Sequence, residues 1–231
     1  MMLVSGGDTE DFSLSYLVTM TFGVVVGVAV NLLVVPPLYL DRASRRLSEL
    51  RNTLSALMAD IADHVERGTV DAEAFDASVV ELDRTTAEVR AEVYEADESR
   101  KANPRGRRRR SISDENLARL RALERAVFYI RDLADVLVTL RRADDAALGR
   151  GVAPALAEAI RACCALVAAP VRAEDSKALS SEANAALERY LMALIEANRG
   201  TATIVADELT PAALLRRTID AALPFVRNDE E

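Results

Sequence analysis

The sequence predicts an all-α fold, in which a single N-terminal transmembrane helix is followed by a cytoplasmic bundle of long helical hairpins. Three observations support this prediction. An uncharged, mainly apolar run covers residues 12–40. After it, apolar residues recur at spacings of three and four, which is the period of an amphipathic helix. No alternating run bounded by turn residues indicates a strand.

The run from Phe12 to Leu40 contains no Asp, Glu, Lys, Arg or His. A helix needs about 20 apolar residues to cross the roughly 30 Å hydrocarbon layer of a bilayer, and the stretch from Leu14 to Val35 supplies them. A cleaved signal peptide fits less well, because acidic rather than basic residues precede the run. A buried core helix is the other alternative, but such helices rarely extend so far without a charge.

The flanks of the run predict its orientation and its end. No Lys or Arg precedes it, and basic residues beside a span remain cytoplasmic. We therefore expect residues 1–11 to be a short extracytoplasmic N-terminus at the plasma (inner) membrane. Pro36 and Pro37 lack amide donors and are expected to end the spanning helix, residues 12–40, at the interface. The arginines that follow the run are Arg42, Arg45, Arg46 and Arg51.

One face of the predicted span has small or polar residues four positions apart, at Thr19, Gly23, Gly27 and Asn31. Gly23 and Gly27 remove side-chain bulk, so another helix could approach closely. The Asn31 amide needs a hydrogen-bond partner in hydrocarbon. This face predicts packing in a homo-oligomer or against another integral membrane subunit, although glycine is also common in spans without such a role.

Residues 41–100 predict a long antiparallel helical hairpin. Apolar residues from Leu47 to Val65 form a coiled-coil-like seam on the first helix, and Gly68 suits its C-terminal end. The second helix is expected to start near Asp71 and to reach about Arg100. At about 1.5 Å per residue each helix is roughly 40 Å long, so the second should return to the membrane surface.

The return point coincides with a polybasic loop, residues 101–112, and no acid occurs between Ser99 and Ser113. Three interpretations stay open: contact with anionic lipid headgroups, pairing with the preceding acidic helix, and a solvated linker. The formal net charge of −8 and the lack of interleaved aromatic residues argue against nucleic-acid binding. The residues assigned to lipid contact are Arg105, Arg107, Arg108, Arg109 and Arg110.

Residues 113–231 predict a helical bundle. Its first helix is expected from Ser113, as N-cap, to about Arg142. Glycine and proline residues mark the boundaries of the remaining helices. The further helices are expected at about 154–169, 181–198 and 210–223, the last with Thr210 as its N-cap.

The sequence predicts no enzyme, no cofactor and no catalytic or metal-binding residue. His64 lies on a charged helix face, and the adjacent Cys163 and Cys164 fall in an Ala-rich helical pattern typical of buried small residues in a reducing compartment. No Cys/His spacing matches a zinc site. No phosphate-binding glycine loop or nucleophile elbow occurs either.

The segment from Thr19 to Arg46, with Gly23, Gly27, Asn31 and the Pro36-Pro37 exit, resembles a spanning helix of the fusaric acid resistance / aromatic acid exporter (FUSC-like) family of bacterial membrane proteins. In that family a Gly-rich helix with a small polar residue leads to a Pro-Pro exit and a cytoplasmic helical domain. The resemblance implies an inner-membrane component linked to export of aromatic acids or related small molecules, with cytoplasmic helices that serve assembly or regulation.

The chain also departs from that family, whose members have several spanning helices before this one. One helix cannot line a pore, so transport would require oligomerisation or a separate membrane subunit, unless the chain is a truncated transporter gene model. The alternative, from a different class of protein, is a membrane-anchored coiled-coil scaffold with no transport role.

Overall fold

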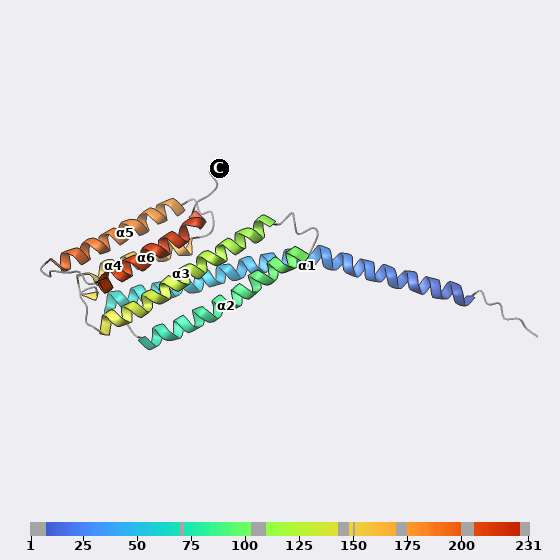
Figure 1. Ribbon diagram of the computed structural model, residues 1–231, viewed down its shortest axis with the longest axis horizontal. Helices are drawn as coiled ribbons and strands as arrows, with labels where there is room; N and C mark the ends of the chain where they lie inside the picture. Colours follow the sequence, from blue (N-terminus) through green and yellow to red (C-terminus); the bar gives the residue numbers. More distant parts are fainter. Residues whose placement is uncertain are drawn as a thin grey trace, which may run out of the picture.

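The computed structural model is all-α in the part of the chain that it describes, as the sequence predicts (Figure 1). That part comprises residues 8–69, 72–102, 110–142, 148–149, 151–169, 175–199 and 206–226, and within it the side chains of residues 8–15, 29–38, 102, 206–208 and 223–226 are not described. The helices are α1 (Asp8–Arg67), α2 (Ala72–Ala102), α3 (Arg110–Arg142), α4 (Ala153–Ala168), α5 (Ser176–Ala197) and α6 (Ala206–Val226).

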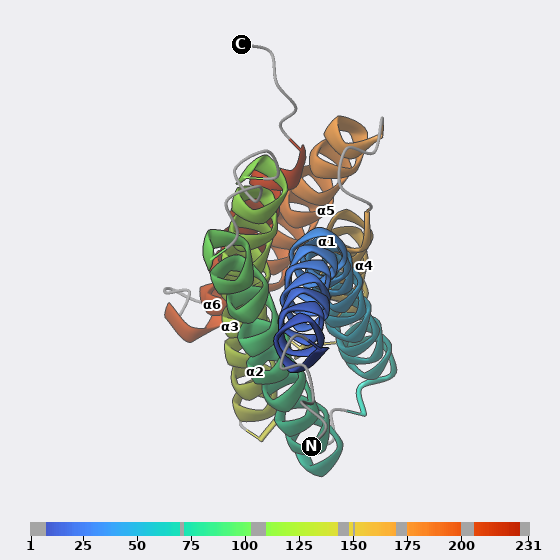
Figure 2. The ribbon, with the colours of Figure 1, turned by 90° about the vertical axis from the view of Figure 1, so that its right-hand side faces the viewer.

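The C-terminal half of α1 packs with the other five helices in one bundle, while the N-terminal half of α1 projects from one end (Figure 1). Helix α1 contacts α2, α3 and α4; α3 also contacts α2 and α6; and α4 also contacts α5 and α6. Viewed along α1, helices α2 and α3 lie on one side of it and α4 lies on the other (Figure 2). Successive helices alternate in direction, so α2 ends and α3 begins at the end of the bundle from which α1 projects.

The core begins where α1 enters the bundle, at Leu40, which is 2% exposed. The predicted seam of α1 is buried along its length, and the same holds for most of the apolar stripe of α3. Burial of apolar side chains is the main favourable contribution to folding, so this seam holds α1 against α2, α3 and α4. The buried seam residues are Leu47, Leu50, Leu54, Leu57, Ile61 and Val65.

Helix α1 ends as its sequence predicts, in a left-handed glycine. Gly68 has φ of 65°, which glycine adopts without the steric cost borne by other residues. Its amide donates to the carbonyl of Val65 at 3.1 Å, and the amide of Thr69 donates to the carbonyl of His64 at 3.0 Å. These two bonds form a Schellman motif, which satisfies carbonyls at the helix end and turns the chain toward α2.

Four predicted helix boundaries are wrong, one of them the start of α3, which is at Arg110 and not at Ser113. The backbone of α1 is helical through Pro36 and Pro37, so the helix does not end there; the fixed φ of proline, near −65°, is itself a helical value. Helix α5 starts at Ser176 and α6 at Ala206, before the predicted starts at 181 and 210. Upstream of each predicted start no Gly or Pro stops the helix from extending toward the N-terminus.

Among the residues whose side chains are described, no helix is both long enough and apolar enough to cross a membrane.

Candidate functional site

The projecting part of α1 is the first unusual surface of the protein. All side chains at residues 16–28, here called the projecting segment, are exposed. Its large apolar side chains range from 42% exposed at Val26 to 70% at Tyr16. They cover the whole circumference of the helix, since thirteen successive positions more than complete three turns. A helix that is apolar on every side is normally covered by protein or by hydrocarbon.

The polar groups of the projecting segment are compatible with a surrounding of protein or hydrocarbon. The Thr21 hydroxyl donates a 2.7 Å hydrogen bond to the carbonyl of Leu17, one turn earlier, and therefore needs no partner outside the helix. An added Cβ at Gly23 or Gly27 would meet nothing within 4 Å. Thr19 is exposed on the same segment. The predicted packing face is thus accessible, while the side chain of Asn31 lies outside the description.

The end of the bundle from which α1 projects, here called the bundle root, is fixed by Asn116 of α3. The Asn116 amide donates to the carbonyl of Leu40 at 3.5 Å. Its Oδ1 accepts a 3.1 Å hydrogen bond from the hydroxyl of Ser44. Asn116 is 3% exposed, and a buried amide with these partners holds the first turns of α3 against the point where α1 enters the core.

Asp97 forms a second set of contacts at the bundle root, between α2 and α3. It lies near the end of α2 and is 4% exposed. Its Oδ1 accepts hydrogen bonds from Ser113 of α3 at 2.6 Å and from Arg100 Nη2 at 2.9 Å, and its Oδ2 lies 2.8 Å from Lys101 Nζ. Ser113 is therefore inside α3, whose first residue is Arg110, and the prediction that it caps the helix is wrong. Its hydroxyl joins two helices instead of satisfying the backbone of one.

These contacts determine the ionisation of Asp97. Burial alone would raise its pKa, but hydrogen bonds from Lys101, Ser113 and Arg100 outweigh burial and lower the pKa to about 2. Hydrogen bonding to the charged form is the cause expected for a buried carboxylate with several donors. Asp97 is therefore a carboxylate at neutral pH and links the C-terminal turn of α2 to the first turn of α3.

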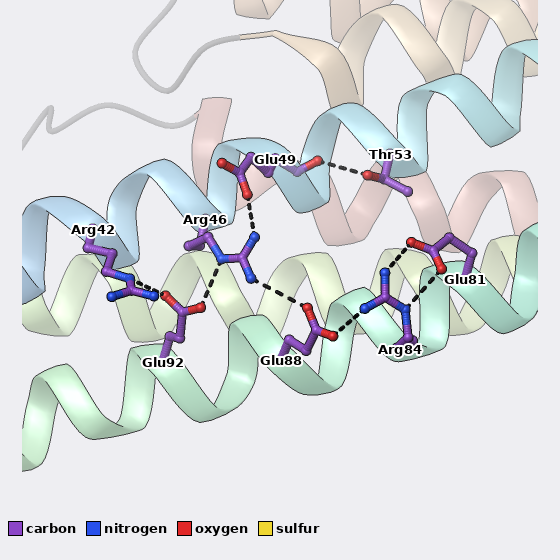
Figure 3. A network of polar contacts seen from close by, with 8 residues as sticks. All are labelled: Arg42, Arg46, Glu49, Thr53, Glu81, Arg84, Glu88 and Glu92. Atoms are coloured by element: carbon purple, nitrogen blue, oxygen red, sulfur yellow. Dashed lines mark hydrogen bonds and ion pairs between the residues drawn. The ribbon is translucent and has the colours of Figure 1, made fainter.

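A chain of ion pairs continues from the bundle root along the α1–α2 contact (Figure 3). Glu92 accepts from Arg42 Nε at 3.0 Å and from Arg46 Nε at 2.9 Å. Arg46 also reaches Glu49 at 2.6 Å and Glu88 at 3.4 Å. Hydrogen bonds to Glu49 and Glu92 raise the pKa of Arg46. Exposed ion pairs contribute little stability singly, so the network mainly sets the register of α2 against α1.

The network ends nearer the N-terminus of α2, where Arg84 pairs with Glu88 and, at 2.6 Å, with Glu81. Both acids are on α2 itself, so this part stabilises one helix and orients Glu88 toward Arg46. The positive charges that follow the apolar run are therefore not all available to an external partner. Arg42 and Arg46 are held by acids of α2, whereas Arg45 is exposed.

The basic residues on either side of the polybasic loop also form ion pairs with nearby acids. Arg100 and Lys101 bond Asp97, Lys101 also pairs with Glu98 at 3.0 Å, and Arg110 lies 3.5 Å from Asp114. Of the five arginines assigned to lipid contact, Arg110 is the one described, and it is 77% exposed at its side chain. Arg105, Arg107, Arg108 and Arg109 lie outside the described residues.

The two cysteines and the histidine, which the sequence analysis considered for chemical roles, take part in packing between helices. Cys163 is buried, which raises its pKa to about 12, and Cys164 Sγ lies 3.2 Å from the carbonyl of Ser55. The rings of His64 and Phe75 form a T-shaped pair, with 5.4 Å between the centroids, across the α1–α2 turn. No group of three His, Cys, Asp or Glu side chains in the part of the chain with described placement could hold a metal ion.

Sequence reasoning missed Asn116, Asp97 and the Glu88–Glu92 pair. The charge pattern offered a signal for the acids, because Glu81, Glu88 and Glu92 recur at intervals that place them near one another on α2. Arg100 and Lys101, three and four residues after Asp97, offered a similar signal for two of its contacts. Nothing comparable marked Asn116, whose partners are on α1, or the bond from Ser113 of α3 to Asp97.

Comparison with protein-family models finds no match to this chain, and comparisons with curated proteins and with solved structures find none either. The class that the fold defines is an all-α bundle with one projecting apolar helix.

Proposed function

We propose that the chain is a single-pass protein of a bacterial plasma (inner) membrane and a component of a small-molecule exporter similar to the FUSC-like aromatic acid exporters. In this proposal its N-terminus is extracytoplasmic, and its cytoplasmic bundle serves assembly or regulation. One observation carries the membrane part: the apolar side chains of the projecting segment are exposed on every side of the helix. Exposed apolar surface of this extent marks a membrane or protein interaction site.

Two further features support the membrane assignment. The projecting segment belongs to the uncharged run of residues 12–40, which is long enough for a span. The bundle root follows it directly and carries Arg42, Arg45 and Arg46, as expected beside the cytoplasmic face of a membrane. Hydrocarbon would cover the apolar side chains, and the first charged turns of α1 would then lie at the headgroups.

A fractionation experiment tests the membrane assignment. The full chain should remain in membranes after an alkaline carbonate wash. The double substitution Val24→Glu and Val25→Glu should release it, since each charge near the middle of a span costs roughly 2.5–3.5 kcal/mol. Val80→Glu is the matched control, because Val80 is at least as exposed as Val24 and Val25 but lies on α2 of the bundle. Release of the wild-type chain by carbonate, or equal retention of all variants, would contradict the proposal.

The exporter assignment rests on the resemblance of the segment from Thr19 to Arg46, and a transport assay tests it. Cells in which the gene is disrupted should accumulate more labelled benzoate, an aromatic carboxylate, and re-expression of the chain should reverse the accumulation. The alternative is a membrane-anchored coiled-coil scaffold, which the observation of one projecting helix on a large bundle favours. Unchanged accumulation by cells with correctly localised protein would select the scaffold.

Contact of the polybasic loop with anionic lipid remains a part of this proposal. Because Arg100 and Lys101 are paired with acids of α2, the binding should depend on the arginines that follow them. Replacing Arg107 to Arg110 with Gln in the bundle, residues 39–231, should weaken its binding to phosphatidylserine vesicles at low salt at least tenfold, at about 1 kcal/mol per basic residue. Arg141→Gln with Arg142→Gln, at the opposite end of α3, is the control. Unchanged vesicle binding would exclude headgroup contact.

A further inference from the structure

Helices α2 and α3 lie side by side and share an outer face, here called the α2–α3 face (Figure 2). On each helix a row of exposed side chains recurs at alternating spacings of three and four, so the row follows one side of the helix. Tyr94 and Phe128 in these rows are large aromatic residues, yet they are 47% and 49% exposed. The rows that make up the face are Ala77, Val80, Arg84, Ala87, Ala91 and Tyr94 on α2, and Asp114, Ala118, Arg121, Arg125 and Phe128 on α3.

Three bridges between α2 and α3 show that the two rows face the same way and which of their residues are level. At 3.6 residues per turn, each bridging residue lies about a quarter to a third of a turn from the exposed row of its own helix. The buried side chains lie on the opposite side of each helix, so both rows face outward in one direction. Interpolation between the bridges places Tyr94 level with Ala118, and Arg84 level with Phe128. The bridges are Asp83–Arg131, Arg90–Glu124 and Asp97–Ser113, at 3.6, 2.5 and 2.6 Å.

The exposed charges of this face are unpaired at two opposite margins. Glu95 is on the side of α2 that carries Glu88 and Glu92, whose carboxylates pair with α1. Arg125 is on the other margin, where it lines a shallow pocket with Arg217 of α6. Neither Glu95 nor the exposed Arg121 and Arg125 form an ion pair with any described residue. Within one chain the two rows separate the acid from these arginines.

We propose that a second copy of this chain packs on the α2–α3 face, so that α2 of each copy lies on α3 of the other. The two copies are related by a two-fold axis parallel to α1, the symmetry that makes the same surface complementary to itself. An axis in this direction keeps both projecting segments pointing the same way, as attachment to one membrane requires, so the orientation rests on the proposed membrane function. It also keeps heights unchanged, and residues that are level within a chain are level between copies.

The two rows are complementary in size at these levels. A large side chain of one copy faces an alanine of the other at three levels, and at the fourth a guanidinium group faces an aromatic ring, which is a favourable cation–π arrangement. Two helical hairpins joined in this way form a four-helix layer. The facing residues, the first of each pair on α2 and the second on α3 of the second copy, are Tyr94 and Ala118, Ala91 and Arg121, Ala87 and Arg125, and Arg84 and Phe128.

The two-fold rotation also brings the unpaired charges together. It places the margin of α2 that carries Glu95 beside the margin of α3 that carries Arg121 and Arg125 in the second copy. Opposite charges at such a margin favour the correct partner and fix its register. Beyond Arg84, both helices carry acids, so the contact is centred between the levels of Tyr94 and Arg84. The acids beyond it are Asp76, Asp132 and Asp135.

Cross-linking of the full chain in membranes tests this contact. Two copies with different tags should be expressed together, one with Ala91→Cys and the other with Ala118→Cys, and treated with a short bis-maleimide. Position 91 is level with position 121, so the two cysteines should lie about 5 Å apart in height. A product that carries both tags should form. Ala77→Cys with Ala118→Cys is the matched control, because Ala77 is in the same row but about 21 Å farther along α2. Chains without added cysteines give the background from Cys163 and Cys164.

Charge reversal tests the pairing at the margin. Glu95→Arg and Arg121→Glu should each lower the yield of the doubly tagged product roughly fivefold, since each replaces an attraction of exposed charges with a repulsion. Chains that carry both substitutions should regain the yield, because the pair is restored with its charges exchanged. Both side chains are exposed, so thermal unfolding of the bundle should not change.

The outcomes separate this inference from the membrane assignment. Chains that resist the carbonate wash but give no product above background would overturn the inference and leave the membrane assignment in place. Equal yields from Ala77→Cys and Ala91→Cys, or no recovery when the two charge reversals are combined, would also overturn it. Release of the wild-type chain by carbonate would instead remove the membrane assignment and, with it, the reason for the parallel axis.

Discussion

Ser113 donates a 2.6 Å hydrogen bond to Oδ1 of Asp97, and this bond joins the first turn of α3 to the last turns of α2. Both residues are nearly inaccessible to water, at 2% and 4% exposed. The two helices are separated in sequence by the polybasic loop, so their ends are fixed to each other by side chains whatever the loop contacts. The bundle root therefore holds the end of α2 and the start of α3 together.

Asp97 should give the protein a specific sensitivity to acid. Its pKa is lowered from 3.8 to about 2, so its contribution is complete above pH 4 and is lost as the pH falls toward 2. A difference of this size corresponds to about 2 kcal/mol. Asp97→Asn should lower the free energy of unfolding at pH 7 by roughly that amount and flatten its decline between pH 4 and 2, as urea titrations would measure. Asp114→Asn, at an exposed acid, should change neither; similar profiles for both variants would contradict the assignment.

Ser113→Ala should destabilise the protein through Asp97. The hydroxyl donates to a charged acceptor, and such hydrogen bonds contribute about 1.5–3 kcal/mol. The substitution should also raise the pKa of Asp97, because one of its donors is removed. In a double-mutant cycle with Asp97→Asn, the two effects on unfolding should be strongly non-additive. Additive effects would mean that the two side chains act independently.

Gly68→Ala should destabilise the turn between α1 and α2. An added Cβ would meet no atom within 4 Å, so the cost comes from the φ of 65° alone. A left-handed conformation costs a non-glycine residue about 1–2 kcal/mol. Gly151→Ala is the control, because Gly151 also has free space and its φ is not positive. Equal unfolding midpoints for the two variants would be inconsistent with a strained position 68.

Glu92→Gln should have a modest and salt-dependent effect. The substitution weakens the bonds to Arg42 and Arg46, but the partners are partly exposed, so the loss should be about 1 kcal/mol or less. It should be largest at low ionic strength and decrease as salt screens the pairs. Glu49→Gln, which affects a pair within α1, should cost less. A loss that does not vary with salt would indicate a packing role for Glu92.

Gly23→Ile with Gly27→Ile tests the predicted packing face. The added side chains fit the isolated chain, since both positions open to free space. They would block close approach of a second helix. The variant should therefore lose oligomers that pack through the span and co-purifying membrane partners, as cross-linking between spans in membranes would reveal, while the unfolding of the bundle stays unchanged. If those oligomers and the partners both persist, the packing prediction is wrong.

The sequence was sufficient for features that depend on a single helix. Leu47 to Val65 follow the helical period, and burial of that face was the one arrangement open to them. Gly68 was recognisable because a left-handed end needs a residue without Cβ. The class of fold followed from such local patterns.

Contacts between helices could not be predicted in the same way. Ser113 resembled a helix cap, since Ser is common there, and its bond to Asp97 depends on how α2 and α3 align in space. Arg90 and Glu124, which join α2 to α3, are widely separated in sequence, and neither shows from its neighbours that the two will pair. Relative register is set by the packing of whole faces, which one helix does not reveal.

The continuity of α1 has a mechanical consequence. The same helix carries the projecting segment and, farther along, the leucines at the centre of the core, with no loop between them. A turn of the projecting segment about its axis would therefore be transmitted as torsion to Leu47 and Leu50. Whatever grips the apolar end of this helix would thereby act directly on the packing of the bundle.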